Sequence, residues 1–482
     1  MSKRIRVEEE KEYVDISPQF IEQCEKKFKA NPANIIARNA INSTGLMFST
    51  MNSTRVNETS HIFLNSVKKH HLRATNQGAS GRCWMFAALN TFRHILINSL
   101  NLEDFEFSEV YLFFWDKLER SNSFLKWFID HPEYTPKDRA YQYMLSDYMN
   151  DGGWWNTFAN LVMKYGLVPK SAMKETFQSD DSRDMNKVIE ERLVNAVNYI
   201  CNNRARLDAE KLNEIREKTV AYIYDTLVKF LGEPPKKFEW GFITHDEDNG
   251  IVANLDPKKF LTTVAPTINM VDDFIILAHI PRQDFQYYTK YEILYTNNVV
   301  EGQNCEIFNV PIEEMAKYAM TSILKGLSVW FVGDVNQSFN WITSTLDDEL
   351  DDSKTVFGTD LYKFEKGDRM MMRNIQGNHA LCFTGFNLDK KGRPVNWQVE
   401  NSWGYWDYET PGLDGFLNMS HSWFKKYVVQ LVVHKKFLSR AMLKKLESAK
   451  KIEIKPWDSL APALCVNGTQ PRNYSQTHLK IN

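Results

Sequence analysis

A long run of apolar positions begins directly after a break formed by Gly78, Ser80 and Gly81. The run CWMFAALNTFRHILINSL starts at Cys83, is apolar at most positions and contains neither glycine nor proline. Such a pattern is typical of a helix that is buried on most sides. We therefore predict a buried helix with the Cys83 thiol at its N-terminus, where unpaired backbone amides lower the pKa of a cysteine.

The remaining hydrophobic patterns divide the chain into a helical first part and a β-rich second part. Helical patterns cover residues 17–28, 107–129, 139–149, 183–231 and 436–451. From about residue 266, short runs of β-branched and aromatic residues alternate with turn clusters, a pattern typical of strands. These strands are predicted at residues 274–280, 290–295, 327–333, 379–386, 396–403, 415–420 and 427–433.

Two of these predicted strands carry candidate catalytic residues. His379 opens the run HALCFTGF, and Asn401 follows the run WQVE on what reads as the next strand of the same hairpin. A cysteine nucleophile needs an imidazole that exchanges protons with it, and the imidazole needs an acceptor on its second nitrogen. Cys83, His379 and Asn401 supply these groups if they meet in space, and Trp403 could shield the bond between the last two.

The side chain of Gln77, six residues before Cys83, offers a further hydrogen-bond donor. Together with the Cys83 backbone N–H it could stabilise the oxyanion of an acyl intermediate. Two alternatives stay open at this point. Cys83 taken alone also fits a small buried core residue. His279 ends another apolar run and rivals His379, but no Asn-Ser-Trp-Gly strand follows it, so we interpret it as structural.

Taken together, QGASGRCW, NHALCF and VENSWG resemble the papain-like cysteine peptidases, in which Gln, Cys, His and Asn occur in this order. The segments TNQGASGRCWMFAALNTFRH, DGGWW and IKPWDSLAPAL are more similar still to the bleomycin hydrolase and bacterial aminopeptidase C group. The likeness extends from about residue 60 to 464. His379 lies 296 positions after Cys83, against roughly 130 to 150 in small papain-like enzymes, which indicates a large insertion.

The resemblance implies an α+β, papain-like two-subdomain fold, with a helical half, a β-barrel-like half, a large helical insertion and a C-terminal arm. The implied parts are an N-terminal arm (1–62), a helical half with Cys83 (63–170), a helical insertion (171–265), a β-rich half with His379 and Asn401 (266–435), and a C-terminal arm with an extension (436–482). It also implies a cysteine aminopeptidase that acts on peptides through an acyl-enzyme thioester, without a cofactor or metal. The helical insertion would help to assemble a homohexamer.

Two further segments are implied to bind substrate. Gly152 and Gly153 match a turn that pairs with an extended peptide, although Asp151 before them also fits a plain helix cap. In the family, the terminal carboxylate of the C-terminal arm binds the substrate's amino group. The matching position is Leu464, yet residues 465–482 follow it. The anchoring charge is then missing unless the extension is removed or Asp458 replaces it.

This departure leaves other functions open. A chain that cannot anchor a free amine could act as a thiol oligopeptidase with endopeptidase activity. A non-catalytic scaffold of the same fold is a third possibility. Binding of nucleic acid through the basic residues 435–451 is disfavoured, because 59 Lys and Arg against 61 Asp and Glu give a net charge of −2.

Composition also bears on the compartment and on metals. The chain begins without an apolar core of signal-peptide length and contains no run long enough to cross a membrane. Its six cysteines are scattered, without a C-x-x-C pair, which fits a reducing environment. We therefore expect a cytoplasmic protein. His70 and His71 are adjacent and too few to form a metal site.

Overall fold

The computed structural model describes residues 15–67, 72–146, 148–264, 270–361, 364–404 and 414–464. Its contacts divide the chain into two units, one formed by residues 1–58 with 349–363 and the other by residues 59–348 with 364–482. The smaller unit is helical. Its helices are α1 (Pro18–Lys29), α2 (Pro32–Thr44), α3 (Leu46–Thr50), α4 (Ser53–Glu58) and α14 (Ser353–Phe357). The side chains of Ser17 and Asn31 cap α1 and α2, each followed by a proline that suits the first helical position.

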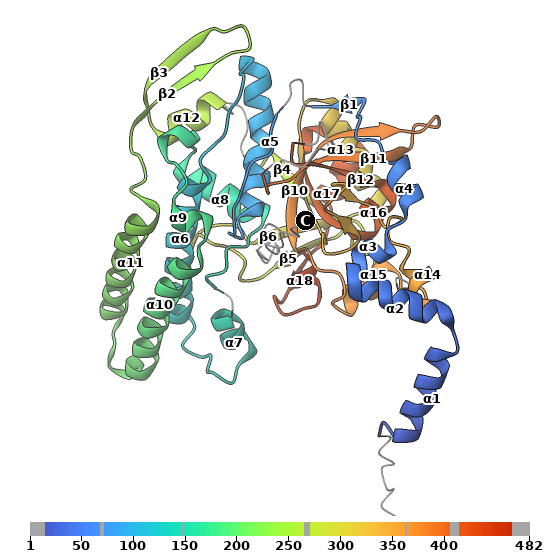
Figure 1. The fold of residues 1–482 in the computed structure, drawn as a ribbon. Helices are drawn as coiled ribbons and strands as arrows, with labels where there is room; N and C mark the ends of the chain where they lie inside the picture. Colours follow the sequence, from blue (N-terminus) through green and yellow to red (C-terminus); the bar gives the residue numbers. More distant parts are fainter. Residues whose placement is uncertain are drawn as a thin grey trace, which may run out of the picture. The chain divides into compact units, whose positions relative to one another are not determined.

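The larger unit is a mixed arrangement of helices and one large sheet (Figure 1). Its first part contains α5 (Cys83–Leu100), α6 (Glu109–Asp130), α7 (Arg139–Ser146), α8 (Trp155–Tyr165), α9 (Phe177–Asp180), α10 (Arg183–Asn203), α11 (Ala209–Leu231) and α12 (Pro257–Val264). Short 3₁₀ turns lie at Lys170–Ala172 and Arg204–Arg206, and a separate hairpin is formed by β2 (Phe238–Ile243) and β3 (Asn249–Leu255).

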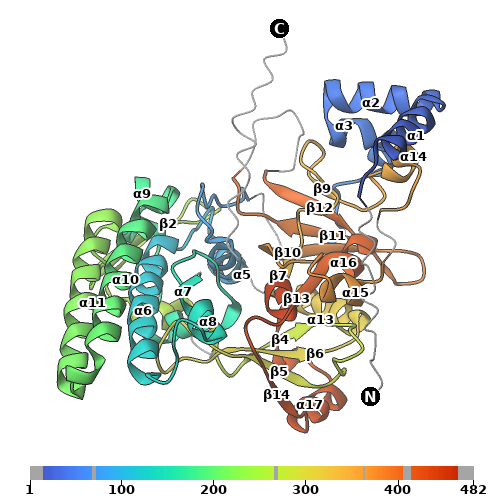
Figure 2. The ribbon, with the colours of Figure 1, turned by 90° about the horizontal axis from the view of Figure 1, so that it is seen from below.

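The predicted helix over residues 183–231 is in fact two helices, α10 and α11, which lie beside α6 (Figures 1 and 2). The chain turns at Asp208, whose carboxylate accepts the Lys211 N–H at 2.8 Å and starts α11. An N-cap of this kind breaks a helical run without any glycine or proline. The patterns that predicted α1, α5, α6, α7 and α17 are confirmed, and α5 begins at Cys83 itself.

The second part of this unit builds a mixed sheet with the strand order β14-β5-β6-β4-β13-β7-β10-β11-β12-β9-β8, and β1 pairs with β10. The strands are β1 (Asn65–Ser66), β4 (Phe274–Ala278), β5 (Lys290–Ile293), β6 (Cys305–Asn309), β7 (Val329–Gly333), β8 (Phe339–Asn340), β9 (Thr345–Leu346), β10 (His379–Leu388), β11 (Pro394–Glu400), β12 (Phe416–Ser420), β13 (Val428–His434) and β14 (Lys451–Ile454). All seven predicted strands are present, while β1, β6, β8, β9 and β14 were not predicted.

Helices also occur between these strands. They are α13 (Ile312–Leu324), α15 (Lys366–Met371), α16 (His421–Tyr427), α17 (Arg440–Glu447) and α18 (Leu460–Leu464), with a 3₁₀ turn at Lys435–Phe437. The helix α13 was not predicted. In the part of the chain that the structure describes, none of the helices combines the length and the apolar character needed to span a bilayer.

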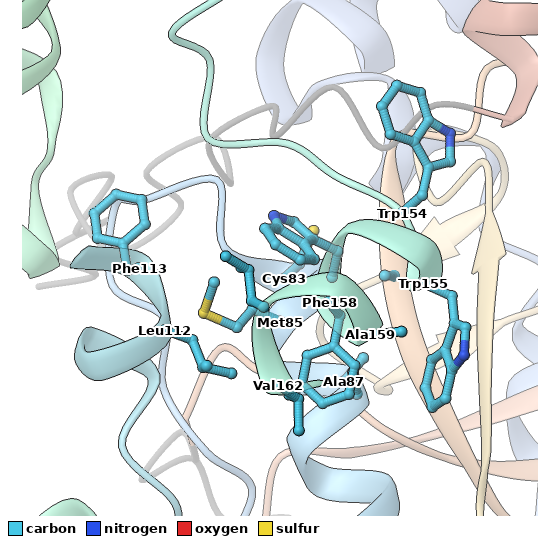
Figure 3. Close-up of a cluster of buried hydrophobic side chains, with 14 of the residues drawn as sticks. Cys83, Met85, Ala87, Leu112, Phe113, Trp154, Trp155, Phe158, Ala159 and Val162 are labelled. Carbon is cyan, nitrogen blue, oxygen red and sulfur yellow. The ribbon is translucent and has the colours of Figure 1, made fainter. Parts of the chain in front are cut away.

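Helix α5 is the central element of the larger unit. It lies between α6 and α8 on one side and the strands β7 and β10 on the other (Figure 2). Side chains from α5, α6 and α8 form a continuous apolar core around Cys83 (Figure 3). On the sheet side, Trp330 Nε1 of β7 donates to the Trp84 carbonyl at 3.0 Å, and Thr91 Oγ1 lies 3.6 Å from Cys382 Sγ of β10. The helix therefore runs along β10, with Cys83 at the end where His379 begins the strand.

Candidate active site

Cys83 lies at the junction between the helix and the sheet. It is the first residue of α5 and is 1% exposed. The thiol accepts hydrogen bonds from the backbone amides of Ala380, Trp84 and Cys83 itself, and these bonds lower its pKa. Ala380 directly follows His379 on β10. The sulfur of the early helix therefore lies within hydrogen-bonding reach of the backbone of the strand that His379 begins.

His379 and Asn401 meet at one end of the β10–β11 hairpin, as predicted. His379 Nε2 lies 2.8 Å from Asn401 Oδ1. The same oxygen accepts the Ser402 backbone N–H at 2.8 Å, which identifies it as the acceptor. Nε2 must therefore carry the proton, and Nδ1 is the nitrogen left to exchange a proton with a thiol.

The indole of Trp403 covers this pair. Its ring stacks on the imidazole of His379, with centroids 4.6 Å apart and an interplanar angle of 25°. An aromatic cover of this kind keeps water away from the hydrogen bond between His379 and Asn401 and strengthens it. The geometry is that expected from the sequence.

Gln77 is fixed from three sides. Its Nε2 donates to the Ser80 carbonyl at 2.6 Å, its Oε1 accepts the Ser402 hydroxyl at 2.6 Å, and its backbone N–H donates to the Ser402 carbonyl at 2.8 Å. One of the two N–H bonds of the side-chain amide is therefore used. A role of the other in stabilising an oxyanion stays a prediction. The Cys83 N–H, at the first position of a helix, lies outside the hydrogen bonds of the helix itself.

The two halves of the site are joined by backbone contacts as well. Asn76 forms a β-bridge with Trp403, and the Gly404 N–H donates to the Thr75 carbonyl at 2.9 Å. Glu400, the residue before Asn401, is fully buried and accepts from Arg93 Nη1 at 3.2 Å and pairs with His94 Nε2 at 2.7 Å. Both partners belong to α5, so these two interactions connect the helix that carries Cys83 to the strand that leads to Asn401.

Burial dominates the protonation of the cysteine and histidine. Burial raises the pKa of Cys83 to about 12, against the backbone amides that lower it, and the Asp151 carboxylate adds to the rise. Burial lowers the pKa of His379 to about 4, while the bond to Asn401 raises it. The prediction of a lowered thiol pKa is therefore wrong for the group alone, because desolvation outweighs the helix terminus. By itself, each group is therefore neutral near pH 7.

The Gly152–Gly153 turn lies against the base of this site. A Cβ on Gly153 would come within 2.6 Å of the Trp84 indole, so only glycine fits beside the residue that follows Cys83. The Gly152 N–H donates to Asn150 Oδ1 at 2.7 Å, and its carbonyl accepts from Arg120. Pairing of this turn with a substrate backbone stays a prediction.

Asp151 does not cap a helix, because its carboxylate binds inside the molecule. It pairs with Lys117 at 2.7 Å and accepts from Ser182, from Asn186 at 2.8 Å and from the Gly81 N–H at 3.2 Å. Burial alone would raise the pKa of Asp151, but Lys117 and these hydrogen bonds lower it, so the group stays charged. The Asp-Gly-Gly segment does lead into a helix, α8, as the alternative interpretation had it, but the N-cap of that helix is Trp154 and not Asp151.

The C-terminal arm reaches the active-site end of the sheet. The Gly377 N–H, two residues before His379, donates to the Pro462 carbonyl at 3.2 Å. Leu464 is fully buried, and its carbonyl accepts from Gln430 Nε2 of β13 at 3.0 Å. A cavity of about 240 Å³ lies between the arm and the helical half. It is lined by residues that include Gly152, Trp154, Tyr148, Tyr295, Pro456, Ala461 and Pro462.

Asp458 of the arm forms an ion pair with Arg282. Arg282 Nη1 lies 3.1 Å from Asp458 Oδ1, and the same oxygen accepts the Leu460 N–H at 2.8 Å. Arg282 also binds Asp284, at 3.0 and 2.5 Å, so one guanidinium is shared by two carboxylates. The replacement of a terminal carboxylate by Asp458 stays a prediction. Residues 465–482, and also His70 and His71, lie outside the described residues.

The rival histidine, His279, lies in a different environment. Its Nε2 is 3.2 Å from the Tyr287 hydroxyl, and its Nδ1 is 3.2 Å from Lys366 Nζ. Burial, with the nearby Lys366 ammonium, lowers the pKa of His279 to about 2. Its ring is therefore neutral and occupied on both nitrogens, as its structural interpretation requires.

Three residues of the site were not identified from the sequence. Ser402 orients Gln77, Arg82 holds the loop before Cys83, and Asp151 joins that loop to the Gly-Gly turn. Each belongs to a motif that was recognised, but each has a partner that is distant in the sequence. The separation is 70 positions for Asp151 and Gly81, 93 for Arg82 and Glu175, and 325 for Ser402 and Gln77. The signal in the sequence that could have identified these residues is that each lies inside a motif already assigned to the site.

A helix-borne cysteine facing a histidine and asparagine on a hairpin defines a cysteine peptidase site, and the chain belongs to the Peptidase C1-like family, which it matches over residues 15–461. It is 34% identical to aminopeptidase C of Listeria monocytogenes over 441 residues, covering 91% of this chain and 97% of that protein. It is 32% identical to human bleomycin hydrolase over 444 residues, covering 90% and 96%. The crystal structure of PepW from Lactobacillus rhamnosis superposes with a TM-score of 0.87 at 30% identity, covering 92% of this chain and 98% of that one.

Proposed function

We propose that this protein is a thiol aminopeptidase that releases N-terminal residues from peptides through an acyl-enzyme thioester. The observation that carries the proposal is the Nε2–Oδ1 bond of 2.8 Å between His379 and Asn401, which leaves Nδ1 free at the end of the sheet where Cys83 lies. The names of the relatives, aminopeptidase C and bleomycin hydrolase, support the same activity.

The chemistry follows from the arrangement of these groups. Nδ1 of His379 takes the thiol proton as Cys83 attacks the scissile carbonyl carbon. The positive charge of the imidazolium and the negative charge of the oxyanion therefore form together. Gln77 and the Cys83 N–H stabilise the negative oxygen of the tetrahedral intermediate. The imidazolium then protonates the departing amine, and the neutral ring later activates water to hydrolyse the thioester. Asn401 keeps the ring in one tautomer throughout.

The proposal includes the papain-like division of the larger unit. Its helical half carries Cys83 and its sheet-containing, barrel-like half carries His379 and Asn401, while α10 and α11 form the main part of a helical insertion. The strand order and the position of α5 support this division. Residues 436–464 would form the C-terminal arm, and the cytoplasmic location expected from composition remains a prediction.

The test of the activity is cleavage of aminoacyl-arylamides by the full chain and by a Cys83→Ala variant. We expect hydrolysis by the first and none by the second, because no other thiol can replace a nucleophile on the N-terminus of α5. A Cys83→Ala protein that retains cleavage would refute the proposal. A fold equal to that of the wild type, checked by circular dichroism, serves as the control.

A second candidate, a thiol oligopeptidase with endopeptidase activity, is favoured by one observation. The carbonyl of Leu464 is bonded to Gln430 inside the molecule, and one oxygen of Asp458 is bonded to Arg282, so both groups already have partners within the chain. Peptides with blocked N-termini distinguish the two activities. A chain that ends at Leu464 should prefer free N-termini more strongly than the full chain does; equal preference would remove this candidate.

The oligomeric state is proposed from the family resemblance. The protein would form a homohexamer to which the helical insertion contributes, and light scattering that gives the mass of one chain would contradict this. A non-catalytic scaffold of the same fold is the remaining alternative, and the Cys83→Ala comparison above also tests it. The near-neutral charge argues against binding of nucleic acid.

A further inference from the structure

Arg82, the residue before Cys83, has a buried guanidinium that is held by a carboxylate from a distant segment. It is fully buried, and its Nη1 and Nη2 lie 3.2 and 2.9 Å from the two carboxylate oxygens of Glu175. The guanidinium also lies over the rings of Phe86 and Phe113, at 5.1 and 5.2 Å. A two-bond pair of this kind fixes orientation as well as charge.

The remaining bonds of Arg82 lead to Gln77. Arg82 Nε donates to Ser80 Oγ at 2.7 Å, and Ser80 Oγ donates to the Gln77 carbonyl at 2.6 Å. Arg82 Nη2 reaches the same carbonyl at 3.4 Å. The Ser80 carbonyl in turn accepts Gln77 Nε2 at 2.6 Å. Hydrogen bonds and the backbone of Ser80 therefore connect Glu175 to the side-chain amide that we assign to the oxyanion.

Glu175 belongs to the segment that opens the predicted helical insertion. Burial alone would raise the pKa of Glu175, but the Arg82 guanidinium and the Ser179 hydroxyl lower it, so the carboxylate is charged. The same segment makes a second contact with the loop, because the Ala79 N–H donates to the Asp180 carbonyl at 2.8 Å. The start of the insertion thus supports the loop that precedes Cys83.

We infer that Arg82 and Glu175 form a positioning pair that sets the oxyanion donor Gln77, and that the insertion takes part in catalysis through this pair. The inference rests on the proposed function. Neither residue touches the reacting atoms. Removing the charge of Glu175 leaves a buried guanidinium without its partner, and the loop of residues 77–82 loses its fixed shape.

The test compares Glu175→Gln with Glu119→Gln as a matched control. Glu119 is a buried glutamate of the helical half, paired with Lys164 at 2.6 Å. Its described hydrogen bonds lead to Lys164 and Tyr165 rather than to the loop before Cys83. We expect Glu175→Gln to lower kcat for an aminoacyl-arylamide by about 10- to 100-fold with KM within about threefold, since loss of a whole oxyanion donor costs about 10²–10³. Glu119→Gln should leave both constants close to those of the wild type.

Two reagents separate the oxyanion from the thiol itself. An amino aldehyde forms a hemithioacetal whose oxygen occupies the oxyanion position, whereas iodoacetamide alkylates sulfur without forming an oxyanion. We expect Glu175→Gln to weaken inhibition by the aldehyde by about the same factor as kcat and to leave the alkylation rate of Cys83 unchanged. An equal fall in both would mean a general loss of structure and would overturn the inference.

A double variant tests whether the pair acts through Gln77. In a Gln77→Ala background, Glu175→Gln should cause little further loss, because the donor it positions is already absent. Losses that multiply would overturn the inference, as would wild-type kinetics for Glu175→Gln. Arg82→Lys, which keeps the charge but not the two-bond geometry, should fall between the wild type and Glu175→Gln. Failure of the proposed function would instead be visible in the wild type, as cleavage that does not depend on Cys83.

Discussion

His379 and His279 occupy equivalent places in the sheet and have different surroundings. His379 begins β10, and His279 directly follows β4. Both are buried, and burial lowers the pKa of both, to about 4 and about 2. One ring bonds to the Asn401 side-chain oxygen, while the other faces Lys366 and the Tyr287 hydroxyl.

The contrast shows that burial and strand position do not identify a catalytic histidine. An acceptor on the second nitrogen stabilises the imidazolium that forms when a thiol gives up its proton. For His279, the Lys366 ammonium beside Nδ1 repels that charge. Asn401 therefore favours the charged form of His379, whereas Lys366 disfavours the charged form of His279.

The largest expected difference comes from removing each imidazole. His379→Ala should lower kcat/KM by at least about 10³-fold, because the proton has no other carrier. His279→Ala should leave kcat/KM within about threefold and lower the free energy of unfolding by about 1–3 kcal/mol, since Tyr287 and Lys366 lose a buried partner. Steady-state kinetics and urea unfolding measure the two effects. A large catalytic loss in His279→Ala would invalidate the distinction.

The second comparison removes the group on the second nitrogen of each ring. Asn401→Ala should lower kcat by about 10- to 100-fold, the equivalent of one hydrogen bond of about 1.5–3 kcal/mol to a charged group. Tyr287→Phe removes the corresponding bond to His279 and should leave kcat unchanged. The measurement is kcat at saturating substrate. If both variants retain full activity, Asn401 has no orienting role.

The pH dependence sharpens the comparison further. Because burial lowers the pKa of His379 to about 4, kcat/KM should persist in weak acid and fall as the ring is protonated near pH 4. The bond to Asn401 raises this pKa, so Asn401→Ala should move the acid limb to lower pH. The His279→Ala variant should leave the limb in place. A limb near the ordinary value for histidine, in the wild type, would show that His379 is more exposed to water than described.

The smallest effect concerns Lys366, the partner of His279. Burial lowers its pKa to about 7, against about 10.4 in an unfolded chain. The unfolded state then binds more protons between these values, so the stability that the wild type has relative to Lys366→Met should increase as the pH rises from 7 toward 10. Urea unfolding at pH 6.5 and 9.5 measures the difference. A difference that does not change with pH would mean that Lys366 stays charged.

The elements that carry the site were predictable because their patterns are local. The breakers before Cys83 and the apolar run after it gave the start of α5, and two strand-like runs gave the hairpin that joins His379 to Asn401. By contrast, α13 was not predicted, although it follows Pro311 and has acidic residues in its first turn. Both features indicate a helix start, but they occur in a region that was expected to be β.

The interactions that orient the site could not be predicted in the same way. Glu400 lies more than 300 positions from Arg93 and His94, and Ser402 lies 325 positions from Gln77. No periodicity relates residues so distant in the chain. The pKa of Cys83 was wrongly predicted for a related reason: the favourable amides are local, but the burial that outweighs them is produced by the whole fold.

The burial of Leu464 affects when the tail could be processed. A protease holds its substrate as an extended and accessible strand, but Leu464 has no exposed surface and its carbonyl is bonded to Gln430. Trimming back to this residue therefore requires the last turn of the arm to lift from the sheet first. Amide hydrogen exchange of residues 460–464 reports how often that opening occurs. When the protease is in excess, the opening would limit the rate at which the tail is removed.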